Sequence, residues 1–178
     1  QRTEINVVND CCATGANNRN SRYDLVVVGA GSAGFSAAIT AAEQGAQVAL
    51  IGGGTIGGTC VNVGCVPSKA LIRATEAVHH ANAAGSRFAG IEGNARVTDW
   101  RVQVAQKDDL VASLRQAKYA DLLPAYNNVA YHEGRARLVD GGVDAGGERF
   151  ASDRIIIATG TRPAQPTIPG IADVSPLD

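Results

Sequence analysis

The pattern of apolar positions becomes regular at Tyr23. The run "YDLVVVG" is short, β-branched and ends in glycine, which is typical of a buried strand in a parallel sheet. The following "FSAAITAAEQG" has small, helix-compatible residues and ends at Gly45, a residue type that commonly terminates helices. "AQVALIG" then predicts a second strand. The order of strand, glycine turn, helix and strand predicts a βαβ unit of about 30 residues.

Two longer helices are expected beyond this unit. One follows Pro67 through "SKALIRATEAVHHANAA", since proline is tolerated in the first turn of a helix. The other spans Trp100 to Leu123, where apolar residues recur at helical spacing. The segments 128–140 and 147–160 are expected to be strands, with glycine-bearing turns between them. The pattern therefore predicts an α/β fold, Rossmann-like, with a parallel sheet and a small β meander.

The two ends of the chain differ from this pattern. Residues 1–22 are polar, rich in Asn and without periodicity, so we expect an arm or linker there and one domain over 23–178. The chain contains no Met and stops at Asp178 without a closing element. We therefore expect it to be a piece of a longer protein.

Composition narrows the function classes. The 178 residues are enough for one domain, and with 4% aromatic residues its core must be aliphatic. A net charge of -1 gives no reason to expect nucleic acid or an anionic membrane as a partner, and no apolar run is long enough to span a bilayer. Four cysteines do not make a disulfide scaffold in a chain of this size. We expect an intracellular, cytoplasmic protein, where paired cysteines are more often catalytic or metal-binding.

The "GAGSAG" turn indicates a dinucleotide site. Gly29 permits the tight turn, Gly31 lets the backbone approach a diphosphate, and Gly34 lets the helix pack close to the strand. The free N–H groups and the dipole at the start of the helix favour the anion. Such units usually carry Asp or Glu near the end of the second strand, to hold the ribose hydroxyls. Here Gly52, Gly53 and Gly54 occupy that place, so the ribose must be held in another way.

Two cysteines follow in "GGTCVNVGCVPSKAL". Cys60 and Cys65 would point apart in a regular helix, which advances about 100° per residue, but Gly64 permits a distorted backbone that brings them together. Cys65 would then lie near a helix N-terminus with Lys69 four residues on, and both features favour a thiolate. A redox-active pair beside a dinucleotide is the favoured interpretation. Structural zinc and inert thiols are the alternatives.

The arm carries a second pair of thiols, Cys11 and Cys12. A vicinal pair could capture a metal ion and pass it on, or it could be two spectator thiols. The sequence leaves this choice open.

"GGTCVNVGCVPSK" resembles the active-site segment of the pyridine nucleotide–disulfide oxidoreductases, and "DRIIIATGTRPAQPTIPG", from Asp153 to Gly170, resembles the same family's second flavin segment. The resemblance implies an FAD-binding domain whose FAD takes electrons from NADPH or NADH bound to a later domain. It also implies a homodimer. The residues expected at the cofactor are Gly29, Gly31, Ser32, Ala33, Gly34, Gly54, Thr59, Lys69, Ala136, Thr159 and Gly160.

The same resemblance assigns roles to the thiols. In the oxidised enzyme Cys60 and Cys65 would form a disulfide, with Cys60 as the outer exchange thiol and Cys65 near the flavin ring. Lys69 would lie at the reactive edge of the flavin. "TIGGTCVNVGCVPSK" and the Lys-Tyr pair in "LRQAKYADLL" are most similar to the family's Hg(II)-reducing branch, in which NADPH reduces Hg(II) to Hg(0) and the two cysteines are metal ligands. The dihydrolipoamide-oxidising branch is the second choice. A non-catalytic thiol module that binds and passes on metal is the alternative of another class.

Overall fold

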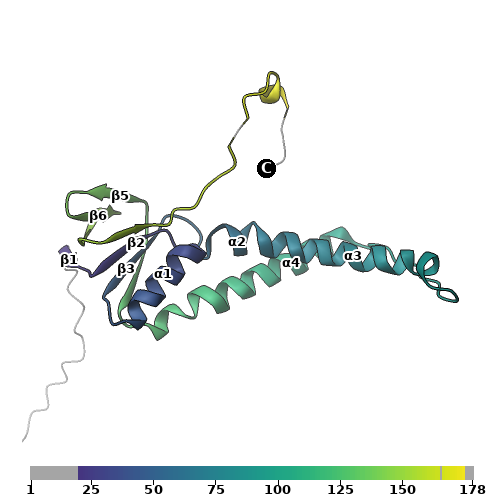
Figure 1. Cartoon of the computed structure of the whole chain (residues 1–178), viewed down its shortest axis with the longest axis horizontal. Coiled ribbons are helices and arrows are strands. Elements are labelled where there is room, and N and C mark those ends of the chain that lie inside the picture. The colour runs from purple at the N-terminus through teal and green to yellow at the C-terminus, as the bar shows by residue number, and fades with distance from the viewer. Residues whose placement is uncertain (1–19, 165, 175–178) are drawn as a thin grey trace, which may run out of the picture.

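A computed structural model describes residues 20–164 and 166–174, and its centre is a four-stranded parallel sheet (Figure 1). The strand order is β4-β3-β2-β8, with β2 at Leu25–Val28, β3 at Val48–Gly52, β4 at Val129–Glu133 and β8 at Ile155–Ile157. Helix α1, Ser32–Glu43, connects β2 to β3 and ends before Gly45, whose φ is +88°. The predicted βαβ unit is confirmed.

A second sheet lies against the first and has the order β1-β7-β6-β5. Strands β5 (Ala136–Val139), β6 (Gly142–Ala145) and β7 (Glu148–Ala151) form the predicted antiparallel meander. The expected glycine-bearing turns lie at 140–141 and 146–147, and between them the chain forms β6, a strand that the sequence did not predict. The last three residues of the expected arm, Asn20–Arg22, form β1 and pair in parallel with β7. Residues 1–19, including Cys11 and Cys12, lie outside the described residues.

Alternate residues of the parallel sheet pack on opposite layers. On one face, Val26, Val28, Ala49 and Ile51 pack with Val143 and Phe150 of the meander. On the other face, Val27, Val48 and Leu50 pack with Phe35, Ala38 and Ala42 of α1. The two central strands, β2 and β3, are therefore covered on both sides, which is why they are apolar runs without polar alternation.

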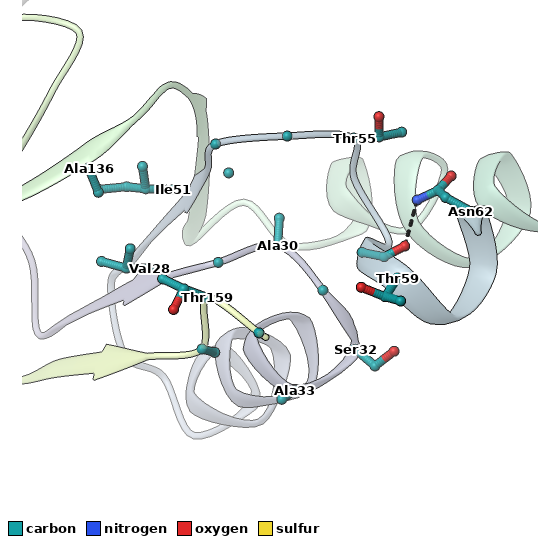
Figure 2. A pocket seen from close by; sticks show the side chains of 18 of the residues that line it. Val28, Ala30, Ser32, Ala33, Ile51, Thr55, Thr59, Asn62, Ala136 and Thr159 are labelled. Carbon is teal, nitrogen blue, oxygen red and sulfur yellow. Dashed lines mark hydrogen bonds between the residues drawn. The ribbon is translucent and has the colours of Figure 1, made fainter. Parts of the chain in front are cut away.

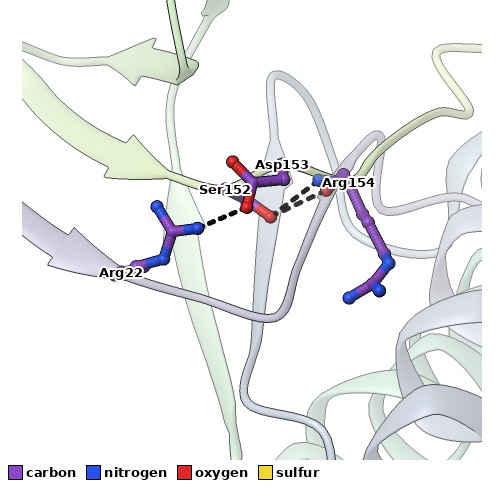
Figure 3. A network of polar contacts seen from close by, with 4 residues as sticks. All are labelled: Arg22, Ser152, Asp153 and Arg154. Carbon is purple, nitrogen blue, oxygen red and sulfur yellow. Dashed lines mark hydrogen bonds and ion pairs between the residues drawn. The ribbon is translucent and has the colours of Figure 1, made fainter.

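A polar turn joins the meander to the parallel sheet (Figure 3). Ser152 is 2% exposed, and its hydroxyl donates to the Arg154 carbonyl oxygen at 2.9 Å and accepts from the Arg154 N–H at 3.1 Å. Beside this turn, Arg22 of β1 forms an ion pair with Asp153. The hydrogen bonds satisfy a buried hydroxyl at the point where the chain passes from β7 to β8.

The remaining helices extend from one end of the sheet. Helix α2, Gly58–Asn62, is followed after two residues by α3, Cys65–Arg87, which runs beside α4, Trp100–Arg115 (Figure 1). α3 begins at Cys65, two residues earlier than the expected start at Pro67, so Pro67 lies inside its first turn. α4 continues into a π-helix, Gln116–Ala120; short 3-10 helices follow at Leu123–Ala125 and Ile171–Asp173.

None of the helices in the described part of the chain combines the length and the apolar character needed to cross a lipid bilayer.

We predict that Phe150→Ala lowers the free energy of unfolding by about 3–5 kcal/mol, because Phe150 is fully buried where the meander meets the parallel sheet. Its ring also lies 4.4 Å from the His132 ring, between centroids. Leu138→Ala is the matched control: Leu138 is 58% exposed on β5, and its loss should change stability by at most about 0.5 kcal/mol. Urea unfolding of both variants measures this, and equal losses would contradict the assigned core.

Candidate active site

A cleft of about 850 Å³ opens at the carboxyl ends of β2, β3 and β8 (Figure 2). Ligands of open α/β sheets bind at this edge, outside the carboxyl ends of the strands. Most of the predicted cofactor residues line the cleft: Gly29, Gly31, Ser32, Ala33, Gly54, Thr59, Ala136, Thr159 and Gly160. Cys60 lines it as well, whereas Gly34 is buried behind the turn, and Cys65 and Lys69 lie on α3 outside its lining.

Two positions of the turn from β2 into α1, Gly29 and Gly34, are packed too closely for a side chain. A Cβ atom on Gly34 would lie 1.8 Å from the Gly29 carbonyl oxygen, and a Cβ on Gly29 would lie 2.1 Å from the Ala158 carbonyl oxygen. Gly29 also has a φ of +116°, which favours glycine. Gly34 therefore brings the helix close to the strand, as its position in the turn predicts.

The start of α1 suits a diphosphate. Gly31 is the N-cap, no side chain caps the helix, and no acidic residue lies in its first turn. The first N–H groups of a helix lack partners within it, and the helix dipole adds a partial positive charge there. Among the described residues, a Cβ on Gly31 would meet only the Gly58 Cα, at 3.6 Å, so there is open space beside this glycine at the start of the helix. The residues present fit an anionic dinucleotide.

The two cysteines lie on either side of a helix break. Cys60 is in α2, the break falls at Val63 and Gly64, and Cys65 begins α3. A Cβ on Gly64 would lie 3.0 Å from the Thr59 carbonyl oxygen and 3.3 Å from the Cys60 Cα. The glycine thus lets the start of α3 pack directly on the backbone at Cys60. Both cysteines are free and exposed in the structure, and their side chains are joined by a hydrogen bond.

Neighbouring groups act on the Cys60 thiol in opposite directions. The hydrogen bond with the Cys65 side chain is the main cause that raises the pKa of Cys60 above its ordinary value, and desolvation and the charge of Cys65 add to it. The backbone N–H of Cys65 and the Lys118 ammonium lower that pKa, but they do not offset the rise. Cys60 is therefore less ionised at neutral pH than an isolated thiol.

Lys118 and its neighbour Tyr119 come from the π-helix after α4. The Tyr119 hydroxyl lies 3.3 Å from the Ser32 hydroxyl, and its ring packs edge-on against Phe35 with centroids 5.0 Å apart. π-helical turns are rare and are frequent at functional sites. This one places a tyrosine against the glycine turn and a cation near the outer thiol.

Sequence reasoning missed Asn62, which fixes the loop between the cleft and the thiols. Its side-chain amide donates to the carbonyl oxygens of Gly58 at 2.8 Å and Ile56 at 3.0 Å, the first of which is drawn in Figure 2. Its carbonyl accepts from Arg115 at 3.0 Å. The letters alone hold no signal for this link, because Arg115 is 53 residues away.

The described residues contain no group of three or more His, Cys, Asp or Glu side chains that could hold a metal ion. A structural zinc site at Cys60 and Cys65 would need two further ligands. Within the described part of the chain, no side chains supply these two further ligands to the cysteine pair.

Fold and cleft together define a dinucleotide-binding α/β domain with a pair of thiols beside its cleft. The family described as "Pyridine nucleotide-disulphide oxidoreductase" matches residues 23–176, and the chain belongs to this family. It is 45% identical to a mercuric reductase of Lysinibacillus sphaericus over 84% of this chain and 27% of that protein. It is 42% identical to a mercuric reductase of Staphylococcus aureus over 90% of this chain and 29% of that protein.

A solved structure shares the architecture. The HOCl-induced flavoprotein disulfide reductase RclA from Escherichia coli superposes with a TM-score of 0.66 and 29% sequence identity, over 84% of this chain and 31% of that one. The chain thus spans less than a third of the length of these relatives. The predicted family and fold class are confirmed.

We predict that Cys65→Ala moves the pH midpoint of Cys60 alkylation to lower pH, because it removes the hydrogen bond that raises the Cys60 pKa. Lys118→Ala should move the midpoint to higher pH, and Lys118→Arg, which keeps the charge, should leave it in place. Alkylation of the reduced protein by iodoacetamide, followed by peptide mass spectrometry, isolates Cys60 from the other cysteines. An unchanged midpoint in Cys65→Ala would refute the thiol contact.

Proposed function

We propose that this chain forms the first part of the FAD site and the redox-active cysteine pair of an NADPH-driven oxidoreductase that reduces Hg(II) to Hg(0). The observation that carries the proposal is the break between α2 and α3, which brings Cys60 and Cys65 together beside a cleft suited to a dinucleotide. The similarity to mercuric reductases supports Hg(II) as the substrate.

The residues of this chain would divide the work as follows. The diphosphate would be held by the turn at Gly29 and Gly31 and by the uncapped start of α1. Thr59 and Cys60 also line the cleft, so the cofactor site extends as far as the first thiol. Cys60 is exposed and receives the metal ion, and Cys65 supplies the second sulfur. Two thiolates suit a soft cation such as Hg(II).

The overall reaction balances with two electrons. NADPH gives two electrons and leaves as NADP⁺ and a proton, and Hg(II) accepts the two electrons to become Hg(0). Bound FAD would supply the relay of these electrons between nicotinamide and metal. Binding of Hg(II) by the two thiols releases their protons, since only the thiolate is the ligand.

A disulfide substrate is the second candidate, and the structural likeness to a flavoprotein disulfide reductase favours it. In that case Cys60 would attack the substrate disulfide through its thiolate. The non-catalytic thiol module remains the alternative of another class. Bound flavin with its yellow absorbance would exclude that module at once.

Membership of the family supports a proposal for the organisation of the whole protein. We propose that residues 23–178 are the first part of the FAD-binding domain, with the nicotinamide and dimerisation domains elsewhere in the protein. A cytoplasmic homodimer remains the expected state.

We predict that Hg(II), in excess small thiol, stimulates NADPH oxidation by the full-length protein that contains this chain. Cys65→Ser should reduce the stimulated rate on the order of a thousandfold or more, because the hydroxyl can neither form the disulfide nor bind a soft metal. The loss of NADPH absorbance measures both rates. Robust turnover with dihydrolipoamide and none with Hg(II) would move the assignment to the second branch of the family.

We also predict that residues 1–178 alone bind FAD weakly and lose it on desalting. The glycine turn holds only the diphosphate, and the thiols meet one side of the flavin ring, so few contacts offset the translational freedom that the cofactor loses. Flavin fluorescence during an FAD titration measures the affinity. Sub-micromolar binding would show that this part of the site suffices.

A further inference from the structure

The ribose end of the cleft lacks the group that such sites usually carry. Dinucleotide-binding βαβ units hold the ribose hydroxyls with an Asp or Glu near the end of the second strand. That strand is β3, and it ends in Gly52, followed by Gly53 and Gly54, all of which line the cleft. If the chain binds a dinucleotide as proposed above, another residue must meet the ribose.

Tyr131 occupies the space that a side chain at position 52 would need. A Cβ atom built on Gly52 would lie 2.7 Å from the Tyr131 hydroxyl oxygen and 3.1 Å from both the ring Cε2 and the Ala30 Cβ. Tyr131 lies on β4 opposite Leu50, and its ring packs in the layer between the sheet and α1. A side chain at position 52 would therefore have to displace the Tyr131 ring from this packing.

The Tyr131 hydroxyl is free to bind a ligand. Among the described residues it has no hydrogen-bond partner. It is also not sealed inside the protein, because no fully buried polar side-chain atom of the described part lacks a partner. Gly52 and Ala30, which border the same space, both line the cleft, whereas Tyr131 itself is not part of the lining. The hydroxyl therefore lies beside Gly52, at the edge of the cleft and next to a residue of its lining.

Glu133 contributes to the same corner. It is exposed, and it is the register partner of Gly52 on the adjacent strand, two residues after Tyr131. Partial burial raises the pKa of Tyr131, and the charge of Glu133 raises it further. Tyr131 therefore stays protonated at neutral pH, and its hydroxyl can both donate and accept a hydrogen bond.

We propose that Tyr131 replaces the missing acid and that its hydroxyl binds the ribose hydroxyls of the adenosine half of the dinucleotide. The group has moved from β3 to the neighbouring strand β4, and Gly52 is the residue that makes room for it. This proposal rests on the proposed function, because it takes FAD as the dinucleotide.

The test compares FAD with an analogue whose adenosine ribose lacks the 2′ and 3′ hydroxyls. Both are titrated into the flavin-free, full-length protein that contains this chain, and quenching of flavin fluorescence gives each dissociation constant. The unaltered protein should bind FAD more tightly than the analogue. Tyr131→Phe, which keeps the ring and removes only the hydroxyl, should weaken FAD binding by roughly 3- to 10-fold and leave the analogue unchanged.

Two further variants separate ribose binding from a structural role. Tyr126→Phe is the matched control, since the Tyr126 hydroxyl binds Glu43 at 3.1 Å away from the cleft lining, and it should leave both dissociation constants in place. The double variant Gly52→Glu with Tyr131→Val returns a carboxylate to β3 and removes the ring that blocks it. It should restore the preference for FAD over the analogue that Tyr131→Phe loses, as expected if a carboxylate on β3 and the Tyr131 hydroxyl serve the same ribose.

The outcomes distinguish this proposal from the one on which it rests. If the full-length protein binds no FAD, the proposed function fails and the ribose assignment fails with it. If it binds FAD and Tyr131→Phe still prefers FAD over the analogue to the same extent, the role of Tyr131 alone is overturned. Circular dichroism and the melting temperature of Tyr131→Phe confirm that the variant is folded before binding is compared.

Discussion

The rest of the structure depends on one place where main-chain atoms meet without room for a side chain. A Cβ on Gly34 would overlap the Gly29 carbonyl oxygen, and a Cβ on Gly29 would overlap the Ala158 carbonyl oxygen. Because both obstacles are backbone atoms, no change of rotamer could relieve them. The contact joins the end of β2, the start of α1 and the end of β8, and these three ends line the cleft. The dinucleotide site therefore follows from the packing of the βαβ unit and needs no charged side chain in that turn.

Glycines that let two backbone segments touch also connect the cleft to the thiols. A Cβ on Gly58 would lie 2.7 Å from the Gly31 Cα, so α2 starts in direct contact with the turn into α1. Gly64 then lets α3 start against the backbone at Cys60. Asn62 ties these pieces together through Gly58 and Arg115. Close backbone contacts therefore connect the cleft to Cys60, and Cys60 to Cys65. The distance between the two thiols is set by the main chain.

The sequence predicted the features that depend on residues close together along the chain. The βαβ unit was predictable because β-branched strands, the glycine turn and Gly45 lie within a few residues of each other. Strand β6 was missed, because glycines at 141, 142, 146 and 147 leave only Val143 to Ala145 between them; its strand character comes from pairing with β5 and β7 on both sides. The role of Tyr131 was also not predicted, because it depends on strand pairing. Its closeness to Gly52 depends on the register of β3 and β4, which no local pattern records.

The raised pKa of Cys60 affects the two candidate reactions, disulfide exchange and metal capture, to different extents. In thiol–disulfide exchange the thiolate attacks, so a raised pKa lowers the fraction of reactive groups at neutral pH. In metal capture the cation itself displaces the protons, so the complex forms well below the pKa of the thiol. The contact between the Cys60 and Cys65 side chains raises that pKa, and it also places two sulfurs where one soft cation can bind both. Under the proposed function, this arrangement would therefore impede exchange with a disulfide more than capture of a soft cation.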